Sequence, residues 1–381
     1  AAKAKEVTKG FIYDRPYKKR KSNNQEPQLD PSINFNEILL EILSHENISS
    51  REPVYEKYDK QVQGRTYTET GMADAGVIAP FNSKNYPEEI QRVGVALSTD
   101  HNPRYGLIDP YWCGVNSVVE SMRNVASVGG TPHAITDCLC FGNPEKPHQM
   151  WEFVEGVRGI NDACKAITLK HSPEDPTPII AGNVSFYNES TNNSIPPSPI
   201  ISCLGLIQDV EKSITTCFKH KNSSIIMIGE RKNELGGSVF YSIFNELGRN
   251  IPKPDFEQVK NQIYGVTDCI ENELVLSCHD ISDGGLATAL CEMTFENLIG
   301  CEILINTTMS NEKTLFSETG GFIIEARDEE VSAITKIFDK YNIPVSQIGR
   351  TGGEKIRINN VIDLLVADAK QNWETGLRNK L

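Results

Sequence analysis

The sequence of 381 residues lacks the patterns by which several large classes of protein are recognised. It has no Cys-x-x-Cys pair, which argues against the common zinc and dithiol redox sites. It also has no Gly-x-Ser-x-Gly elbow, no His-Glu-x-x-His pattern and no glycine-rich loop ending in Gly-Lys-Ser/Thr. A serine hydrolase, a zinc peptidase and a Walker-type nucleotide site therefore have little support. No apolar run approaches the roughly 18 residues that a membrane-spanning helix needs.

Positive charge is scarce, because 38 Lys and Arg residues face 51 Asp and Glu residues, for a net charge of -13. This balance opposes non-specific binding to nucleic acid or to an anionic membrane, and we expect neither as a partner. A ligand that carries phosphate must therefore be held locally, by metal ions, backbone amides or a few basic groups.

Ten cysteines are present, and most lie in apolar runs such as ISCLGL and ALCEMTF, where small buried hydrophobic residues are found. Cys138 and Cys140 lie on one strand-like run, and we expect their thiols to point to opposite faces. The chain opens with no secretory signal pattern, so we expect a reducing, cytoplasmic compartment. The Asn-x-Ser patterns at Asn183 and Asn188 are then not glycosylation sites.

The chain is long enough for two or three packed units. Strand-like runs alternate with helical segments from Val93 onward, which predicts an α/β or α+β architecture. We expect an N-terminal arm or linker with short helices over 1–70, two folded domains over 71–210 and 211–360, and a helical tail over 361–381.

One helix is predicted from about Gly114 to Val128, ending before two glycines. Glu120 and Asn124 are i and i+4 neighbours on one side of it, away from the apolar residues. A carboxylate and an amide stacked in this way can share a hard cation such as Mg²⁺, which prefers oxygen ligands. On the spacing alone, a solvent-facing polar stripe is the favoured interpretation.

A polar turn, His279 to Leu286 (HDISDGGL), follows an apolar strand-like run and precedes a helical one. Amides at a helix N-terminus favour an anion, glycines let a ligand approach the backbone, and acidic groups can carry a metal to a phosphate. The alternative is that Ser282 or Asp283 only caps the helix.

Three further acids and amides lie where an apolar strand gives way to a turn, a common place for ligand groups in α/β sheets. Asp137 belongs to the run AITDCLCF, Asn183 to the run IIAGNVSF, and Asp74 to the short stretch GMADAGV. Taken singly, each could be a structural turn.

Several long motifs together resemble phosphoribosylformylglycinamidine synthase, the ATP-dependent amidine-forming ligase of purine biosynthesis. They are STDHNPRYGLIDPYWCGVNSVVESMRN, GGTPHAITDCLCFGNPEKP, AGNVSFYNES, IPPSPIISCLGLI, LGGSVF and SCHDISDGGLATALCE, in this order. The resemblance runs from about Tyr13 to Trp373. It implies an aminoimidazole-ribonucleotide-synthetase-like unit, in which a domain with a mixed or antiparallel sheet is followed by a second α/β sandwich domain. The family's enzymes contain two such halves, and this chain resembles the second, C-terminal half.

The resemblance implies two groups of ligand residues. In the synthase site between the halves, Asp137 and Gly182 would contact ATP, Asn183 would contact Mg²⁺ and Ser185 would contact the substrate, formylglycinamide ribonucleotide. A second, pseudo-symmetric pocket would hold ATP or ADP, and the residues implied there are Asp74, Glu120, Asn124 and Asp280 for Mg²⁺, with Ala73 and Ser282 near the nucleotide.

The resemblance implies no catalytic residue in this chain, because the family's catalytic histidine belongs to the first half and the matching region, 49–66, has no histidine. Its implied partners are the N-terminal half of the synthase and a glutaminase subunit that supplies ammonia. Two alternatives stay open, a self-sufficient homodimeric synthetase and a non-catalytic nucleotide-binding scaffold.

Overall fold

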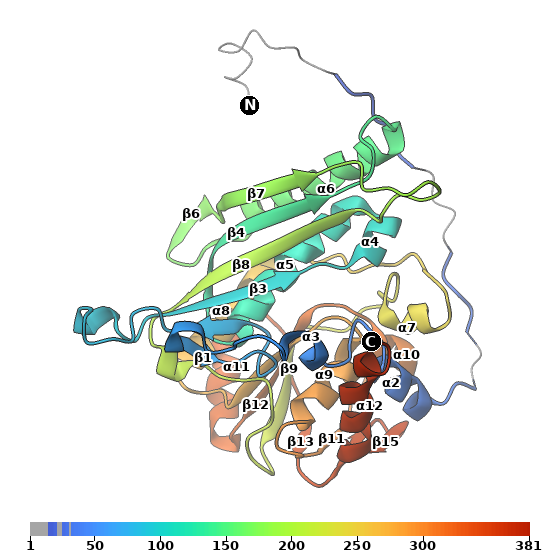
Figure 1. The fold of residues 1–381 in the computed structure, drawn as a ribbon. Coiled ribbons are helices and arrows are strands. Elements are labelled where there is room, and N and C mark those ends of the chain that lie inside the picture. The colour runs from blue at the N-terminus through green and yellow to red at the C-terminus, as the bar shows by residue number, and fades with distance from the viewer. Residues whose placement is uncertain (1–13, 21–24, 30–31) are drawn as a thin grey trace.

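The computed structural model describes residues 14–20, 25–29 and 32–381, and within them the chain forms two α/β units, each built on its own sheet (Figure 1). The arm predicted for 1–70 lies partly outside the described residues. No helix of the described part of the chain is long and apolar enough to cross a membrane.

The first unit contains a six-stranded sheet that is antiparallel except for its last pair, β4 and β7. Its strands, in spatial order, are β1 (Thr66–Thr68), β2 (Gly76–Ile78), β3 (Gly94–Asp100), β8 (Ser198–Ile207), β4 (Thr131–Cys140) and β7 (Ile179–Ser185). Short elements of this unit and its border are α3 (Glu52–Tyr55), α4 (Pro103–Ile108) and the hairpin β5 (Thr168–Leu169) and β6 (Ser172–Pro176).

One face of this first sheet packs on α5 (Pro110–Ser127), which in turn packs on α6 (Pro147–Ala166). The Asp109 side chain accepts hydrogen bonds from the Tyr111 and Trp112 amides, and Pro110 fits the first turn, so α5 begins four residues before the predicted start. The opposite face is open, since Ile78 and Leu97 are 44% and 52% exposed there.

The second unit contains a seven-stranded mixed sheet with helices on both faces. Its strands, in spatial order, are β10 (Ser277–Ile281), β12 (Gly321–Ala326), β9 (Ser224–Ile228), β13 (Val345–Thr351), β11 (Cys301–Ile303), β14 (Lys355–Ile358) and β15 (Ile362–Leu365). Its helices are α2 (Phe35–Leu43), α7 (Val239–Ile243), α8 (Phe256–Glu271), α9 (Gly285–Thr294), α10 (Asn311–Phe316), α11 (Val331–Lys340) and α12 (Val366–Arg378).

The two units share one hydrophobic core. Met122 of α5, Ile263 of α8 and Ile226 of β9 belong to a single buried cluster, so α5 lies between the first sheet and the helices of the second unit. A second cluster on the far face of the second sheet includes Leu39 of α2 and Ala369 of α12. Segments from both ends of the chain thus complete the second unit.

The predicted fold class is confirmed, because a mixed, mainly antiparallel sheet domain is followed by a second α/β sandwich. The predicted domain boundaries stay a prediction. The expectation of a solvent-facing polar stripe on α5 is wrong, because nearly every residue of this helix, Asn124 included, is buried. The expectation that the Cys138 and Cys140 thiols point to opposite faces is also wrong, because residues two apart on a strand share a face. Their sulfurs lie 3.8 Å apart.

Candidate functional site

A cavity of about 330 Å³ lies where α5 and β3 of the first unit meet β10 of the second, and we call it the acid cavity. Five of the predicted residues line it, namely Asp74, Glu120, Asn124, Asp280 and Ser282. Its other lining residues are Asn47, Ile48, Arg51, Thr99, Asp100, His101, His279, Asp283 and Glu292. The structure therefore brings together the whole set of carboxylates and amide predicted for the second metal group.

Local folding explains this convergence. Glu120 and Asn124 are one helical turn apart on α5, while Asp280 is the penultimate residue of β10 and Ser282 follows in the turn. The turn needs glycine at Gly284, which has a positive φ of 78° and whose N–H donates to Glu318 Oε1 at 2.9 Å. The strand, turn and helix predicted from the motif are thus present.

Three buried oxygens in the acid cavity have no hydrogen-bond partner, and they are Asp100 Oδ2, Asn124 Oδ1 and Asp280 Oδ2. The Asn124 amide donates to the other oxygen of Asp100 at 2.7 Å, which leaves its own carbonyl oxygen free. Arg123 Nε is 3.5 Å from Asp280 Oδ2, too far for a good hydrogen bond. Because unpaired buried acceptors are costly and hard cations take oxygen ligands, this donor set fits Mg²⁺.

Three carboxylates of this cavity, those of Asp100, Glu120 and Asp280, are difficult to ionise without a cation. Burial, followed by the charge of Asp280, raises the pKa of Asp100 to about 7. Burial, followed by the charge of Asp74, raises the pKa of Asp280 to about 6. The pKa of Glu120 lies well above its ordinary value for the same two reasons, burial first and then the charge of Asp100. A divalent cation would displace these protons and compensate the negative charges.

Asp100 is a site residue that the sequence reasoning missed. It is the last residue of β3, its pKa is strongly raised and one of its oxygens is unpaired. The available signal was an acid at the end of an apolar strand, the same pattern that drew attention to Asp137. Asp283 was named only as a possible cap and was not assigned to the metal or the nucleotide, yet its side chain lines the acid cavity and accepts a hydrogen bond from Asn102 at 3.0 Å.

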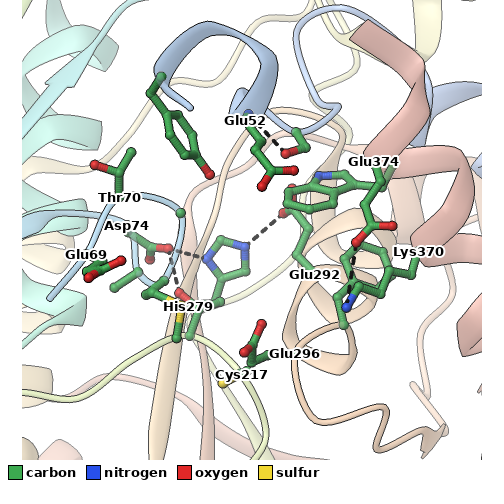
Figure 2. Close-up of a pocket in the computed structure, with 18 of the residues that line it drawn as sticks. Glu52, Glu69, Thr70, Asp74, Cys217, His279, Glu292, Glu296, Lys370 and Glu374 are labelled. Atoms are coloured by element: carbon green, nitrogen blue, oxygen red, sulfur yellow. Dashed lines mark hydrogen bonds and ion pairs between the residues drawn. The ribbon is translucent and has the colours of Figure 1, made fainter. Parts of the chain in front are cut away.

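A second cavity, of about 370 Å³, adjoins the acid cavity and is shown in Figure 2. The wall between them consists of Asp74, His279 and Glu292, which line both. Ala73 lies in this second cavity, whereas Ser282 lies in the acid cavity. The two residues predicted near one nucleotide therefore lie in adjoining cavities, and their roles stay a prediction.

His279 holds this wall together, as Figure 2 shows. Its Nδ1 lies 2.6 Å from Asp74 Oδ1 and its Nε2 lies 2.9 Å from Glu292 Oε2. Burial opposes a charge on the imidazole, but the Asp74 and Glu292 carboxylates together outweigh it, so the pKa of His279 is raised well above its ordinary value. Burial also opposes the charge on Asp74, yet His279 and the Asp280 amide bring the pKa of Asp74 below its ordinary value. The two residues form a buried ion pair.

Replacing His279 with leucine (His279→Leu) is expected to lower the free energy of unfolding by about 3–5 kcal/mol, because Asp74 remains buried without its counter-charge. The Asp74 side chain is only 5% exposed. Denaturant unfolding measures the loss. Arg350→Leu is the matched control, since its ion pair with Asp328 at 2.9 Å is exposed and should contribute below about 1 kcal/mol. Equal losses of unfolding free energy in the two variants would contradict a buried ion pair between His279 and Asp74.

The first group of predicted residues lies elsewhere, at the edge formed by β4 and β7. Asp137 pairs in register with Gly182, and a Cβ atom on Gly182 would lie 2.4 Å from Asp137 Oδ1, so any other residue there would displace this carboxylate. Asn183 and Ser185 pair with Cys138 and Cys140.

Strand alternation divides this group between two faces. Asp137 is paired with the buried residue Ile201 and faces the helices, with Gly182 beside it. Asn183 and Ser185 face the open side, and the Ser185 hydroxyl contacts Asn188 Oδ1 at 3.2 Å. The four residues are thus adjacent in the sheet without sharing one face, and their roles stay a prediction.

Comparison with known proteins follows the same division into two units. The family model described as AIR synthase related protein, N-terminal domain, matches residues 72–207, and that described as AIR synthase related protein, C-terminal domain, matches residues 221–359. Curated relatives include phosphoribosylformylglycinamidine synthase subunit PurL of Methanothrix thermoacetophila, 40% identical over 98% of this chain and 49% of the relative. PurL of Thermococcus sibiricus is 37% identical over 86% of this chain and 43% of the relative. The chain spans about half the length of these relatives.

Among solved structures, Thermotoga maritima PurL complexed with FGAR gives a TM-score of 0.68 at 17% identity and covers 88% of this chain and 53% of that chain. The hydrogenase maturation protein HypE in complex with ATP gives a TM-score of 0.52 at 14% identity and covers 71% of this chain and 84% of that chain. These likenesses show the fold. The resemblance stated from the motifs is confirmed, and because both domain models match in order, the chain belongs to the AIR synthase related family.

Proposed function

We propose that this chain supplies the second, C-terminal half of an ATP-dependent phosphoribosylformylglycinamidine synthase. That enzyme converts formylglycinamide ribonucleotide to its amidine, with nitrogen from ammonia. The observation that carries the proposal is the alignment of nearly the whole chain with half of each curated relative. The proposal places the chain in the cytoplasm, and the ten cysteines, all unpaired, agree with a reducing compartment.

The open face of the first sheet supports a complementary half as partner. Ile78 and Leu97 are exposed on it, and Leu97 lies beside Leu204 in the pairing register. Such an apolar surface is typical of an interface core. Asn183 and Ser185 lie on the same face at its polar end. A partner seated here would enclose both residues, and the substrate would then lie between the halves.

In the proposed reaction, the formamide oxygen of the substrate attacks the γ-phosphorus of ATP and ADP leaves, after which ammonia displaces phosphate to give the amidine. The Ser185 hydroxyl would bind the substrate, and the exposed backbone at Gly182 would let ATP approach beside Asp137. Asn183 would offer its amide oxygen to Mg²⁺, which, when bound, offsets charge on the transferring phosphoryl group. No proton transfer is assigned to this chain, so the acid or base would come from the partner.

The acid cavity would hold a second nucleotide, ATP or ADP, with Mg²⁺ on Asp74, Glu120, Asn124 and Asp280. Support comes from Asn124 Oδ1 and Asp280 Oδ2, which accept no hydrogen bond and can therefore bind a metal ion. Because this cavity is lined by residues of α5 and β3 from the first unit and of β10 from the second, we assign it a structural role.

The test is ATP turnover and amidine formation with the chain alone, with the complementary half alone and with both together. An ammonium salt replaces the glutaminase as nitrogen source, so the third subunit is not needed. We expect product only from the mixture, and only with Mg²⁺ present. The proposal would be overturned if both halves are folded and nucleotide-bound and their mixture still forms no amidine.

The open face also fits a second copy of this chain, which favours the homodimeric synthetase as the second candidate. ATP turnover by the purified chain alone would then be expected, together with a dimer in solution. A scaffold without chemistry predicts a third result, in which the complementary half gains thermal stability from this chain but no activity.

A further inference from the structure

Two thiols face the open side of the first sheet and form a pair that the proposed reaction does not use. Cys138 and Cys140 both lie on β4, their sulfurs are 3.8 Å apart, and both are partly exposed. The other eight cysteines are buried. The pair is therefore the cysteine cluster that a solvent-borne thiophilic ligand can reach.

The strand geometry does not favour a disulfide between them. Alternate residues of a strand are separated by about 6.6 Å along its axis, close to the upper limit for cysteines joined by a disulfide. Their β-carbons would have to approach to about 4 Å, which requires the strand to bend. β4 is paired on both sides, with β8 and β7, across both positions, so bending would break ladder hydrogen bonds.

The separation of the sulfurs instead suits a bridging ion. Two thiolates bound to one tetrahedral cation, each at about 2.3 Å, are about 3.8 Å apart. Oxygen groups lie on the same face, because Asn183 pairs with Cys138 and Ser185 pairs with Cys140. These groups and water can complete the coordination.

We propose that Cys138 and Cys140 form a two-thiolate binding site for a thiophilic d¹⁰ divalent cation of the zinc class. Burial, with a smaller contribution from Cys138, raises the pKa of Cys140, so the free Cys140 thiol holds its proton at neutral pH. Binding forms two metal–sulfur bonds, breaks two S–H bonds and releases both protons to water. No oxidant or reductant is required.

The position of the pair has a consequence that rests on the proposed function. A cation held by the two thiolates would lie beside Asn183 and Ser185, the residues assigned to Mg²⁺ and substrate. The bound ion would then inhibit amidine formation, and Cys140→Ser would relieve the inhibition. Binding itself is measured on this chain alone, so its outcome does not depend on that activity.

The experiment is titration of the reduced, full chain with Cd²⁺, followed by the ultraviolet thiolate-to-cadmium charge-transfer absorption. Oxygen ligands in the acid cavity do not give this absorption. We expect saturation at one ion per chain, proton release, and displacement of Cd²⁺ by excess Zn²⁺. Cys138→Ser and Cys140→Ser should each abolish saturable binding, while thermal melting of each variant checks that it remains folded.

Cys217→Ser is the matched control, because Cys217 lies in the cavity of Figure 2 and not on β4. It should bind Cd²⁺ as the unsubstituted chain does. Unchanged absorption in a folded Cys138→Ser or Cys140→Ser chain would overturn the site, as would the absence of saturable binding to the unsubstituted chain.

Discussion

Replacing Leu97 with glutamate (Leu97→Glu) is expected to abolish association with the complementary half and therefore all amidine formation by the mixture. Leu97 is 52% exposed on the open face of the first sheet, beside Leu204 of the neighbouring strand. A carboxylate buried there without a partner costs several kcal/mol, which corresponds to at least about a 100-fold weaker complex. The isolated variant should unfold at the same temperature as the unsubstituted chain, because the side chain is outside the core.

Association is measured by sedimentation of the mixed halves, and Leu304→Glu serves as the control. Leu304 is 61% exposed and follows β11 of the second unit, away from the proposed interface. The control should associate and turn over normally. A Leu97→Glu chain that binds the complementary half with unchanged affinity would show that the partner uses another surface.

Magnesium is expected to stabilise the chain strongly near about pH 8 and weakly near about pH 5. Asp100 and Asp280 have folded-state pKa values of about 7 and about 6, both raised above their ordinary value. Between about pH 4 and pH 7 the folded state thus holds protons that the unfolded state has released. Without a cation these groups therefore make stability fall as pH rises through this window.

Binding of Mg²⁺ stabilises the ionised carboxylates in the folded state, because they gain a counter-charge. With Mg²⁺ present, the ionisation of these groups therefore no longer lowers the stability as pH rises. At a concentration 100 times its dissociation constant, the ion should add about 2.7 kcal/mol to the free energy of unfolding. Thermal melting with and without Mg²⁺, across the pH range, measures the difference. In Asp280→Asn the gain should largely disappear, whereas Asp328→Asn, at an exposed position, should retain it. An equal gain in the two variants would contradict a metal site in the acid cavity.

The parts of the candidate site that follow from local pattern were predicted well. The i, i+4 spacing of Glu120 and Asn124 places them on one side of a helix, and the strand, polar turn and helix around Asp280 follow from its motif. The meeting of these elements with Asp74 is a long-range contact that no local pattern contains. The family resemblance brought them together, and the structure confirms that they line one cavity.

The remaining differences have physical causes. The polar side of α5 was expected to face solvent, but the helix lies between the first sheet and the second unit, so its polar residues face a cavity instead. Asp100 was overlooked because it ends its strand without a neighbouring glycine or a second acid. The separation of Asp137 from Asn183 onto opposite faces depends on strand register, which becomes certain only when the pairing of β4 with β7 is known.

The most direct test of the proposed function is a titration of the complementary half against a fixed concentration of this chain, with ATP, Mg²⁺, formylglycinamide ribonucleotide and an ammonium salt present. The initial rate of amidine formation should rise linearly and reach a plateau at one complementary half per chain. A rate that is independent of this chain, or full activity of the chain before any complementary half is added, would contradict its assignment as one half of the synthase.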